Sequence, residues 1–206
     1  MLEQQQQPMA YSDFRLDEVI EKFSLDLEEA TGLFAEIPEY EPSDYLKQTL
    51  AQNLDLAVAI NTEKARSEMI ISPILLELMH HRRDHLSFFS GVDFSVDQSQ
   101  GLTGICDFLI SKSPEQLFVR APVVTIVEAK NENLKSGFGQ CLAEMLAAQF
   151  FNQRKGNQIP VIYGVVTIGT IWRFLQLTEK TVQVDLSEYY IQNLNRILGI
   201  LLHFVS

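Results

Sequence analysis

The segment at residues 123–130, Val-Val-Thr-Ile-Val-Glu-Ala-Lys, is apolar on both faces of an expected strand until it reaches Glu128. A strand with one face in water alternates apolar and polar residues, whereas a strand covered on both faces carries a nearly continuous apolar run. The segment therefore predicts a strand buried between two layers of secondary structure.

The other elements follow from periodicity and turn chemistry. Apolar residues at helical spacing predict three helices, at residues 44–58, 62–80 and 138–152. Apolar runs bounded by turn residues predict four more strands, at residues 88–96, 102–110, 161–168 and 171–177. We expect Pro73 to kink or break its helix, and Gly169-Thr170 to form a two-residue hairpin turn. Asp185 and Glu188 resemble a capping box that opens a last helix. This order predicts an α/β (α+β) domain with a central mixed β-sheet flanked by helices.

The composition fits one globular domain, since 46% of the 206 residues are hydrophobic and 21% are charged. The net charge of -11 is concentrated in residues 1–45, which hold 12 acidic and 2 basic residues, against 15 and 14 in residues 46–206. We expect an acidic N-terminal segment, residues 1–45, packed on or appended to a core domain, residues 46–206. An acidic chain binds nucleic acid poorly without specificity, but the nearly neutral core domain leaves room for a local basic groove.

The sequence also bears on location. No apolar run is long enough to cross a bilayer, and the first residues lack the basic and apolar regions of a signal peptide. The two cysteines, Cys106 and Cys141, are too few for a disulfide framework in a chain of this length. These features predict a cytoplasmic protein with no membrane partner.

Glu128 and Lys130 end the buried strand and, being two residues apart, project from the same face. Nowhere else in the chain is an acidic residue followed two positions later by lysine. One interpretation is that the strand simply reaches the surface here and the pair is solvated. The other is a functional site, because function is expected where a local rule is broken without structural need.

The preceding strand carries a second acidic residue, Asp107, among apolar neighbours. A carboxylate in such surroundings is costly unless it is paired, protonated or metal-bound. If the two strands are antiparallel neighbours, Asp107 stands opposite Glu128 when their connection centres between residues 117 and 118. The segment 111–122 nearly meets this condition, so the two carboxylates are expected to converge.

A third acidic residue, Glu68, shares a helical stripe with the apolar residues Ile71, Leu75 and Met79. At 100° per residue this stripe predicts that Glu68 points toward the core, and the alternative is a partly exposed residue near the helix start. Two or three carboxylates can hold Mg²⁺ or Mn²⁺, which polarises a phosphoryl oxygen and activates water, while a lysine stabilises developing charge.

This arrangement resembles the PD-(D/E)xK nuclease superfamily, which has the restriction-endonuclease-like fold. The matching residues are Glu68 on a helix, Asp107 on a strand, Glu128-Ala129-Lys130 on the next strand, and Gln140 on the following helix. The resemblance implies that Glu68, Asp107 and Glu128 are metal ligands for Mg²⁺ or Mn²⁺ and that Lys130 is a catalytic base or charge stabiliser. It also implies that Gln140 orients the DNA strand or a metal-bound water, and that the substrate is DNA. Cys106 stands where the pattern has proline.

Two other hypotheses remain open. The same fold could be a catalytically inactive nucleic-acid-binding or protein-assembly module, its carboxylates and lysine held in ion pairs. An acidic rim around the pocket favours that module, whereas a nuclease is favoured if four basic residues gather there: Lys112, Lys135, Arg154 and Lys155. The third hypothesis is a homodimer, or a larger complex, that uses the apolar last helix, residues 191–205.

Overall fold

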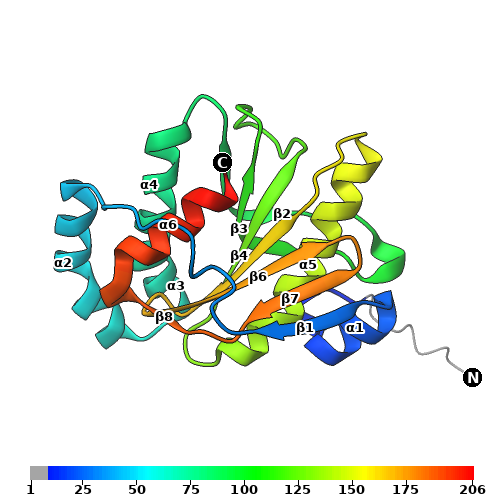
Figure 1. Ribbon diagram of the computed structural model, residues 1–206, viewed down its shortest axis with the longest axis horizontal. Helices are drawn as coiled ribbons and strands as arrows, with labels where there is room; N and C mark the ends of the chain where they lie inside the picture. Colours follow the sequence, from blue (N-terminus) through cyan, green and yellow to red (C-terminus); the bar gives the residue numbers. More distant parts are fainter. Residues whose placement is uncertain (1–8) are drawn as a thin grey trace, which may run out of the picture.

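The buried strand predicted at residues 123–130 lies inside a mixed sheet. The computed structural model describes residues 9–206, and in this range the strand order is β1-β7-β6-β5-β4-β3-β2, with β8 paired to β6 (Figure 1). The pairs β1·β7 and β4·β5 are parallel and the others are antiparallel. The strands are β1 Asp26–Ala30, β2 Ser87–Asp93, β3 Ile105–Ser111, β4 Val123–Ala129, β5 Ile162–Thr167, β6 Ile171–Thr178, β7 Thr181–Asp185 and β8 Tyr189–Tyr190.

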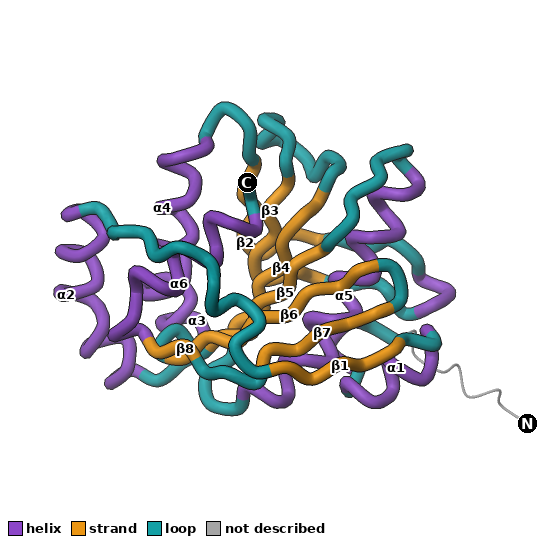
Figure 2. Tube along the Cα trace, viewed as in Figure 1, coloured by secondary structure: helices purple, strands orange, loops and turns teal. Residues whose placement is uncertain are grey.

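Helices cover both faces of the sheet, as the buried character of β4 predicts (Figure 2). Two hydrophobic clusters fill the two interfaces, one beneath α5 and α1 and the other beneath α2, α4 and α6. The mixed α/β architecture is therefore confirmed. The helices are α1 Leu16–Phe23, α2 Asp44–Ile60, α3 Glu63–Arg66, α4 Ser72–Arg82, α5 Leu134–Arg154 and α6 Leu194–Phe204.

The acidic segment shares the sheet with the rest of the chain. Its strand β1 pairs with β7, and its helix α1 packs on α5. Further along, the Tyr40 amide donates to the Asn195 carbonyl at 2.9 Å, and Arg196 pairs with Glu39 at 3.0 Å. The predicted segment 1–45 begins with residues 1–8, which lie outside the described residues.

The helix predicted at residues 62–80 is irregular ahead of Pro73, as expected. Helices α3 and α4 are joined by a π-helical turn, Ser67–Ile71, which the Ser72 amide closes by donating to the Ser67 carbonyl. Such a turn inserts one extra residue into the helical repeat. Side chains on its two sides are therefore rotated relative to a regular helical wheel.

The hairpin and the long helix α5 agree with the sequence predictions, but the predicted capping box is wrong. Asp185 ends strand β7, and the last helix begins only at Leu194. The buried Asp185 carboxylate accepts hydrogen bonds from the Gly32 amide (3.0 Å), the Ser187 amide (2.9 Å) and the Tyr189 hydroxyl (2.8 Å). A helix cannot begin here because the chain continues into strand β8, Tyr189–Tyr190, which pairs with Ile171 and Trp172 of β6.

Replacing Asp185 by alanine should lower the free energy of unfolding by about 2 to 4 kcal/mol, because three donors lose their acceptor in or near the core. Urea denaturation measures this change. The control is Glu188→Ala, which removes the other residue of the expected capping box. The Glu188 side chain is exposed, so this change should lower the free energy of unfolding by less than about 1 kcal/mol. Equal losses in the two variants would contradict the structural role of Asp185.

The apolar residues of the last helix are buried in the hydrophobic core of the same chain. The residues of α6 that pack into the core are Ile197, Leu198, Ile200, Leu201 and Phe204. The reason for expecting a dimer through this helix is therefore removed. Among residues 9–206, no helix combines the length and apolarity needed to span a membrane.

Candidate metal centre

Asp107 and Glu128 face one another across strands β3 and β4. The antiparallel register pairs Phe108 with Val127, and continuing it by one residue places Asp107 opposite Glu128, as expected. Next to the connection Ser111 pairs with Val123, and a register shift between Ile110 and Ser111 brings the two acidic residues into line. Directly opposed residues project to the same side of a sheet, with Cβ atoms about 5 Å apart. Asp107 Oδ2 also accepts a hydrogen bond from the Ala129 amide at 2.8 Å, which fixes its carboxylate beside β4.

Lys130 and Gln140 complete this group of side chains. The Lys130 ammonium donates to Glu128 Oε1 and, at 3.3 Å, to Gln140 Oε1. Gly137 allows the start of α5 to lie this close to the strands, since a Cβ atom there would come within 2.6 Å of Val166 Cγ1 and 3.3 Å of Lys130 Cγ. Three of the four predicted catalytic residues are thus linked by hydrogen bonds, and Asp107 lies opposite Glu128.

Glu68 does not join the group. Its side chain is 62% exposed and pairs with Lys64 at 2.8 Å. It lies at the rim of a cavity of about 260 Å³ that also reaches Asp107. The prediction that Glu68 points toward the core is wrong because Glu68 lies inside the π-helical turn, where 100° per residue no longer holds.

Glu63, which the sequence analysis did not select, is the acidic residue on a helix whose pKa is affected by Asp107 and Lys130. It is the first residue of α3, whose cap is Thr62, and it lines the same cavity as Asp107. Partial burial raises its pKa, Lys130 opposes that shift, and Asp107 adds to it. The sequence signal that could have indicated Glu63 was the capping residue Thr62. Glu63 is the first helical residue after that cap, so its direction is not given by the apolar stripe farther along the helix.

Burial raises the pKa of Glu128 to about 8, with Asp107 adding to the shift and Lys130 opposing it. Burial also raises the pKa of Asp107, against the Ala129 amide and Lys130. Desolvation lowers the pKa of Lys130, but its acidic neighbours, Glu128 first, outweigh this and raise it. The carboxylates thus outnumber the available cations, which favours uptake of a positive ion.

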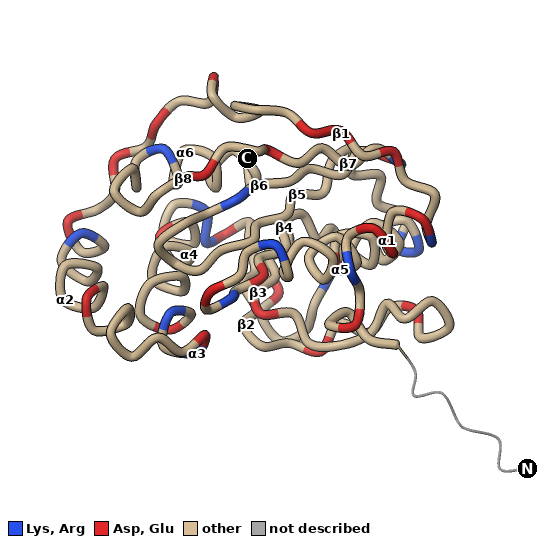
Figure 3. Tube along the Cα trace, turned by 90° about the horizontal axis from the view of Figure 1, so that it is seen from below, with Lys and Arg blue, Asp and Glu red and all other residues tan. Residues whose placement is uncertain are grey.

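The basic residues expected around a nuclease pocket lie elsewhere. Lys112 donates to the Ser206 carbonyl, Arg154 pairs with Asp97 at 2.7 Å, and Lys155 lies over the Phe151 ring. Lys135 lines a separate cavity at the start of α5. Figure 3 shows acidic and basic positions meeting near β3 and β4, and the lining of the 260 Å³ cavity has three acidic residues and one lysine. The rim is therefore acidic.

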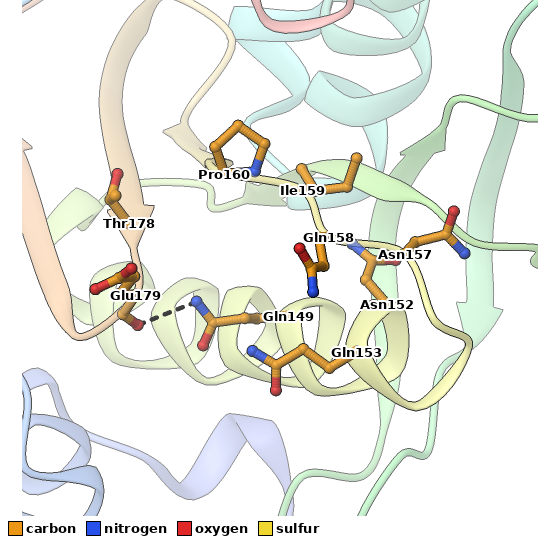
Figure 4. A pocket seen from close by; sticks show the side chains of 9 residues that line it. All are labelled: Gln149, Asn152, Gln153, Asn157, Gln158, Ile159, Pro160, Thr178 and Glu179. Atoms are coloured by element: carbon orange, nitrogen blue, oxygen red, sulfur yellow. Dashed lines mark hydrogen bonds between the residues drawn. The ribbon is translucent and has the colours of Figure 1, made fainter.

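A second cavity, of about 550 Å³, lies at the other end of α5 (Figure 4). Its polar lining consists mainly of amide side chains, and Gln149 Nε2 donates to the Glu179 carbonyl at 3.0 Å. Glu179 is its one ionisable side chain, so this cavity lacks the groups that hydrolysis requires. The carboxylates of β3 and β4 remain the better candidate for chemistry.

The donor set suits a small, hydrated cation. Glu128 Oε2 is buried and has no hydrogen-bond partner among the described residues. Mg²⁺ commonly binds through one or two protein carboxylates and keeps several waters, so Asp107 and Glu128 suffice. In residues 9–206, no group of three or more His, Cys, Asp or Glu side chains is arranged to enclose a metal. The residues therefore fit an open site rather than a closed cage.

Comparison with known proteins gives no independent assignment. The sequence matches no protein-family model and no curated protein. Any function for the chain must accordingly be argued from the geometry of this site.

Proposed function

We propose that this chain is a Mg²⁺- or Mn²⁺-dependent nuclease of the PD-(D/E)xK type that hydrolyses phosphodiester bonds in DNA. The observation that carries the proposal is the pairing of Asp107 with Glu128 on neighbouring strands, with Lys130 and Gln140 beside them. The mixed sheet, with α5 joining the parallel strands β4 and β5, supports the restriction-endonuclease-like fold.

Asp107 and Glu128 would hold the ion, with Glu63 adding negative charge at the cavity. When bound, a divalent ion polarises a phosphoryl oxygen and lowers the pKa of a bound water. Lys130 places an ammonium beside the ligands, where it stabilises charge that develops on the phosphate. Gln140 accepts from that ammonium and so restricts its position.

Calorimetric titration with Mn²⁺ tests the site without a choice of substrate. We expect the wild-type protein to bind Mn²⁺, and Asp107→Asn and Glu128→Gln to weaken binding by at least about tenfold, because each removes a charged ligand. Glu68→Gln is the matched control, since that side chain is exposed and paired with Lys64. Its affinity should stay within about twofold of the wild type. Equal binding by all four proteins would contradict the assignment.

A second candidate is the inactive binding or assembly module. Two observations favour it: Lys130 is paired with Glu128, and the rim of the cavity is acidic. Fluorescence anisotropy with labelled DNA separates the two functions. A nuclease site predicts DNA binding that requires Mn²⁺ and is lost in Asp107→Asn, whereas a binding module predicts equal binding in Mn²⁺ and in a chelator.

A further inference from the structure

Glu144 is a buried acidic residue to which the proposed mechanism gives no role. It lies one turn after Gln140 on α5, is fully buried, and belongs to a face whose other members are mostly apolar. One carboxylate oxygen, Oε2, has no hydrogen-bond partner among the described residues. A buried carboxylate with an unsatisfied oxygen is costly, and apolar residues of similar volume often serve stability better. The position therefore calls for a reason other than stability.

The other carboxylate oxygen of Glu144 ends a chain of hydrogen bonds from the candidate metal centre. Lys130 Nζ donates to Gln140 Oε1 at 3.3 Å, and Gln140 Nε2 donates to Glu144 Oε1 at 3.1 Å. An ammonium only donates, so the end of the Gln140 amide that faces Lys130 must be its oxygen. The amide nitrogen then points along α5, where Glu144 supplies the acceptor. Oε1 can accept whether or not the carboxyl group is protonated.

We propose that Glu144 is a positioning residue that acts through Gln140 to hold the Lys130 ammonium beside Glu128. Without an acceptor at position 144, the Gln140 amide loses the contact that fixes its orientation. It can then turn its donor end toward the ammonium, and Lys130 loses one of its two partners. The importance of this contact for catalysis rests on the proposed function, but the contact itself does not.

The test uses an acceptor-free and an acceptor-bearing replacement. Glu144→Met fills the space without an acceptor, while Glu144→Gln keeps an oxygen that can accept from Gln140. Both proteins and the wild type are acetylated in metal-free buffer with a water-soluble N-hydroxysuccinimide ester, and peptide mass spectrometry gives the rate at each lysine. Lys64, which is 82% exposed, is the internal reference.

We expect Glu144→Met to raise the ratio of Lys130 to Lys64 labelling at least about tenfold, the effect of losing one hydrogen bond to a charged group. Glu144→Gln should stay within about twofold of the wild type. Gln140→Met should reproduce the increase, and the double variant Gln140→Met/Glu144→Met should add nothing, because both changes break one chain. Thermal denaturation should show that Glu144→Met melts no lower than the wild type, which a purely structural role would not give.

An unchanged Lys130 ratio in Glu144→Met, or an equal increase in Glu144→Gln, would overturn the proposal. If Glu144→Met does not fold, Glu144→Leu replaces it as the acceptor-free variant: an increase in Glu144→Leu but not in Glu144→Gln supports the proposal, and any other result contradicts it. The Mn²⁺ titration is separate from these measurements. If Glu144→Met leaves the labelling of Lys130 unchanged while the wild type binds Mn²⁺, only the role of Glu144 is refuted. If the labelling rises as expected but the wild type binds no Mn²⁺, only the metal site is refuted.

Discussion

Replacing Gly139 by alanine should destabilise the protein by about 3 kcal/mol or more, although alanine is the better helix former. A Cβ atom at this position of α5 would lie 2.3 Å from the Phe14 carbonyl oxygen, 2.6 Å from the Arg15 carbonyl carbon and 2.7 Å from the Leu16 nitrogen. These are backbone atoms, which cannot rotate away as the end of a side chain can. The acidic N-terminal segment would have to separate from α5 to make room.

Urea denaturation of Gly139→Ala measures this loss. The exposed Gln153 of the same helix provides the control, where Gln153→Ala should be more stable than Gln153→Gly by up to about 1 kcal/mol. Alanine in place of glycine is thus expected to lower the stability at position 139 and to raise it at position 153. This difference separates the effect of close packing from that of helix propensity. A Gly139→Ala protein as stable as the wild type would show that residues 14–16 do not pack on α5 as described.

In metal-free buffer, the free energy of unfolding should fall by on the order of 3 kcal/mol as the pH rises from about 5 to 8. The pKa of Glu128 is about 8 in the folded protein, against 4.5 for the ordinary side chain. Between these values the folded protein holds a proton on Glu128 that the unfolded chain has released. Raising the pH therefore favours unfolding until the folded carboxyl group also ionises near pH 8. Asp107 and Glu144, whose pKa values are also raised, add in the same direction.

Urea denaturation at several pH values tests this dependence. Glu128→Gln cannot ionise, so its stability should fall less steeply and should gain on that of the wild type toward pH 8. Mn²⁺ binds ionised carboxylates, so it should stabilise the wild type more at pH 8 than at pH 5. An equally steep fall in Glu128→Gln would show that Glu128 is not the group that loses its proton on unfolding.

The candidate site was predictable where the chain itself sets the geometry. The short connection between consecutive strands brings Asp107 close to Glu128, and a register shift between Ile110 and Ser111 then places the two residues opposite one another. The position of Lys130 beside Glu128 follows from the two-residue period of a strand. The helix that carries Gln140 has a long apolar face, and the hairpin at Gly169 has a characteristic turn. These features depend on contacts that are close in sequence.

Glu63 and Glu144 were not predictable in the same way. Glu63 replaces Glu68 near Asp107 because a π-helical turn rotates one half of the helix against the other. Glu144 is four residues after Gln140, so their contact follows from helical spacing, but the full burial of Glu144 and the bond from Lys130 to Gln140 depend on the strands that pack against α5. A helical wheel assumes a regular helix and leaves out the strands that cover it, so it shows neither the π-helical turn nor the contact between α5 and Lys130.

Local chemistry in the sequence by itself determined the buried strand at residues 123–130, the long helix after it, the hairpin, and the pairing of the strands that carry Asp107 and Glu128. Only the tertiary structure decided that residues 26–30 pair with β7, that Asp185 binds Gly32, and that Gly139 receives the backbone of residues 14–16. The physical reason is range. Periodicity and turn chemistry act over a few residues, whereas these contacts join segments more than a hundred residues apart and depend on the space that the packed layers leave.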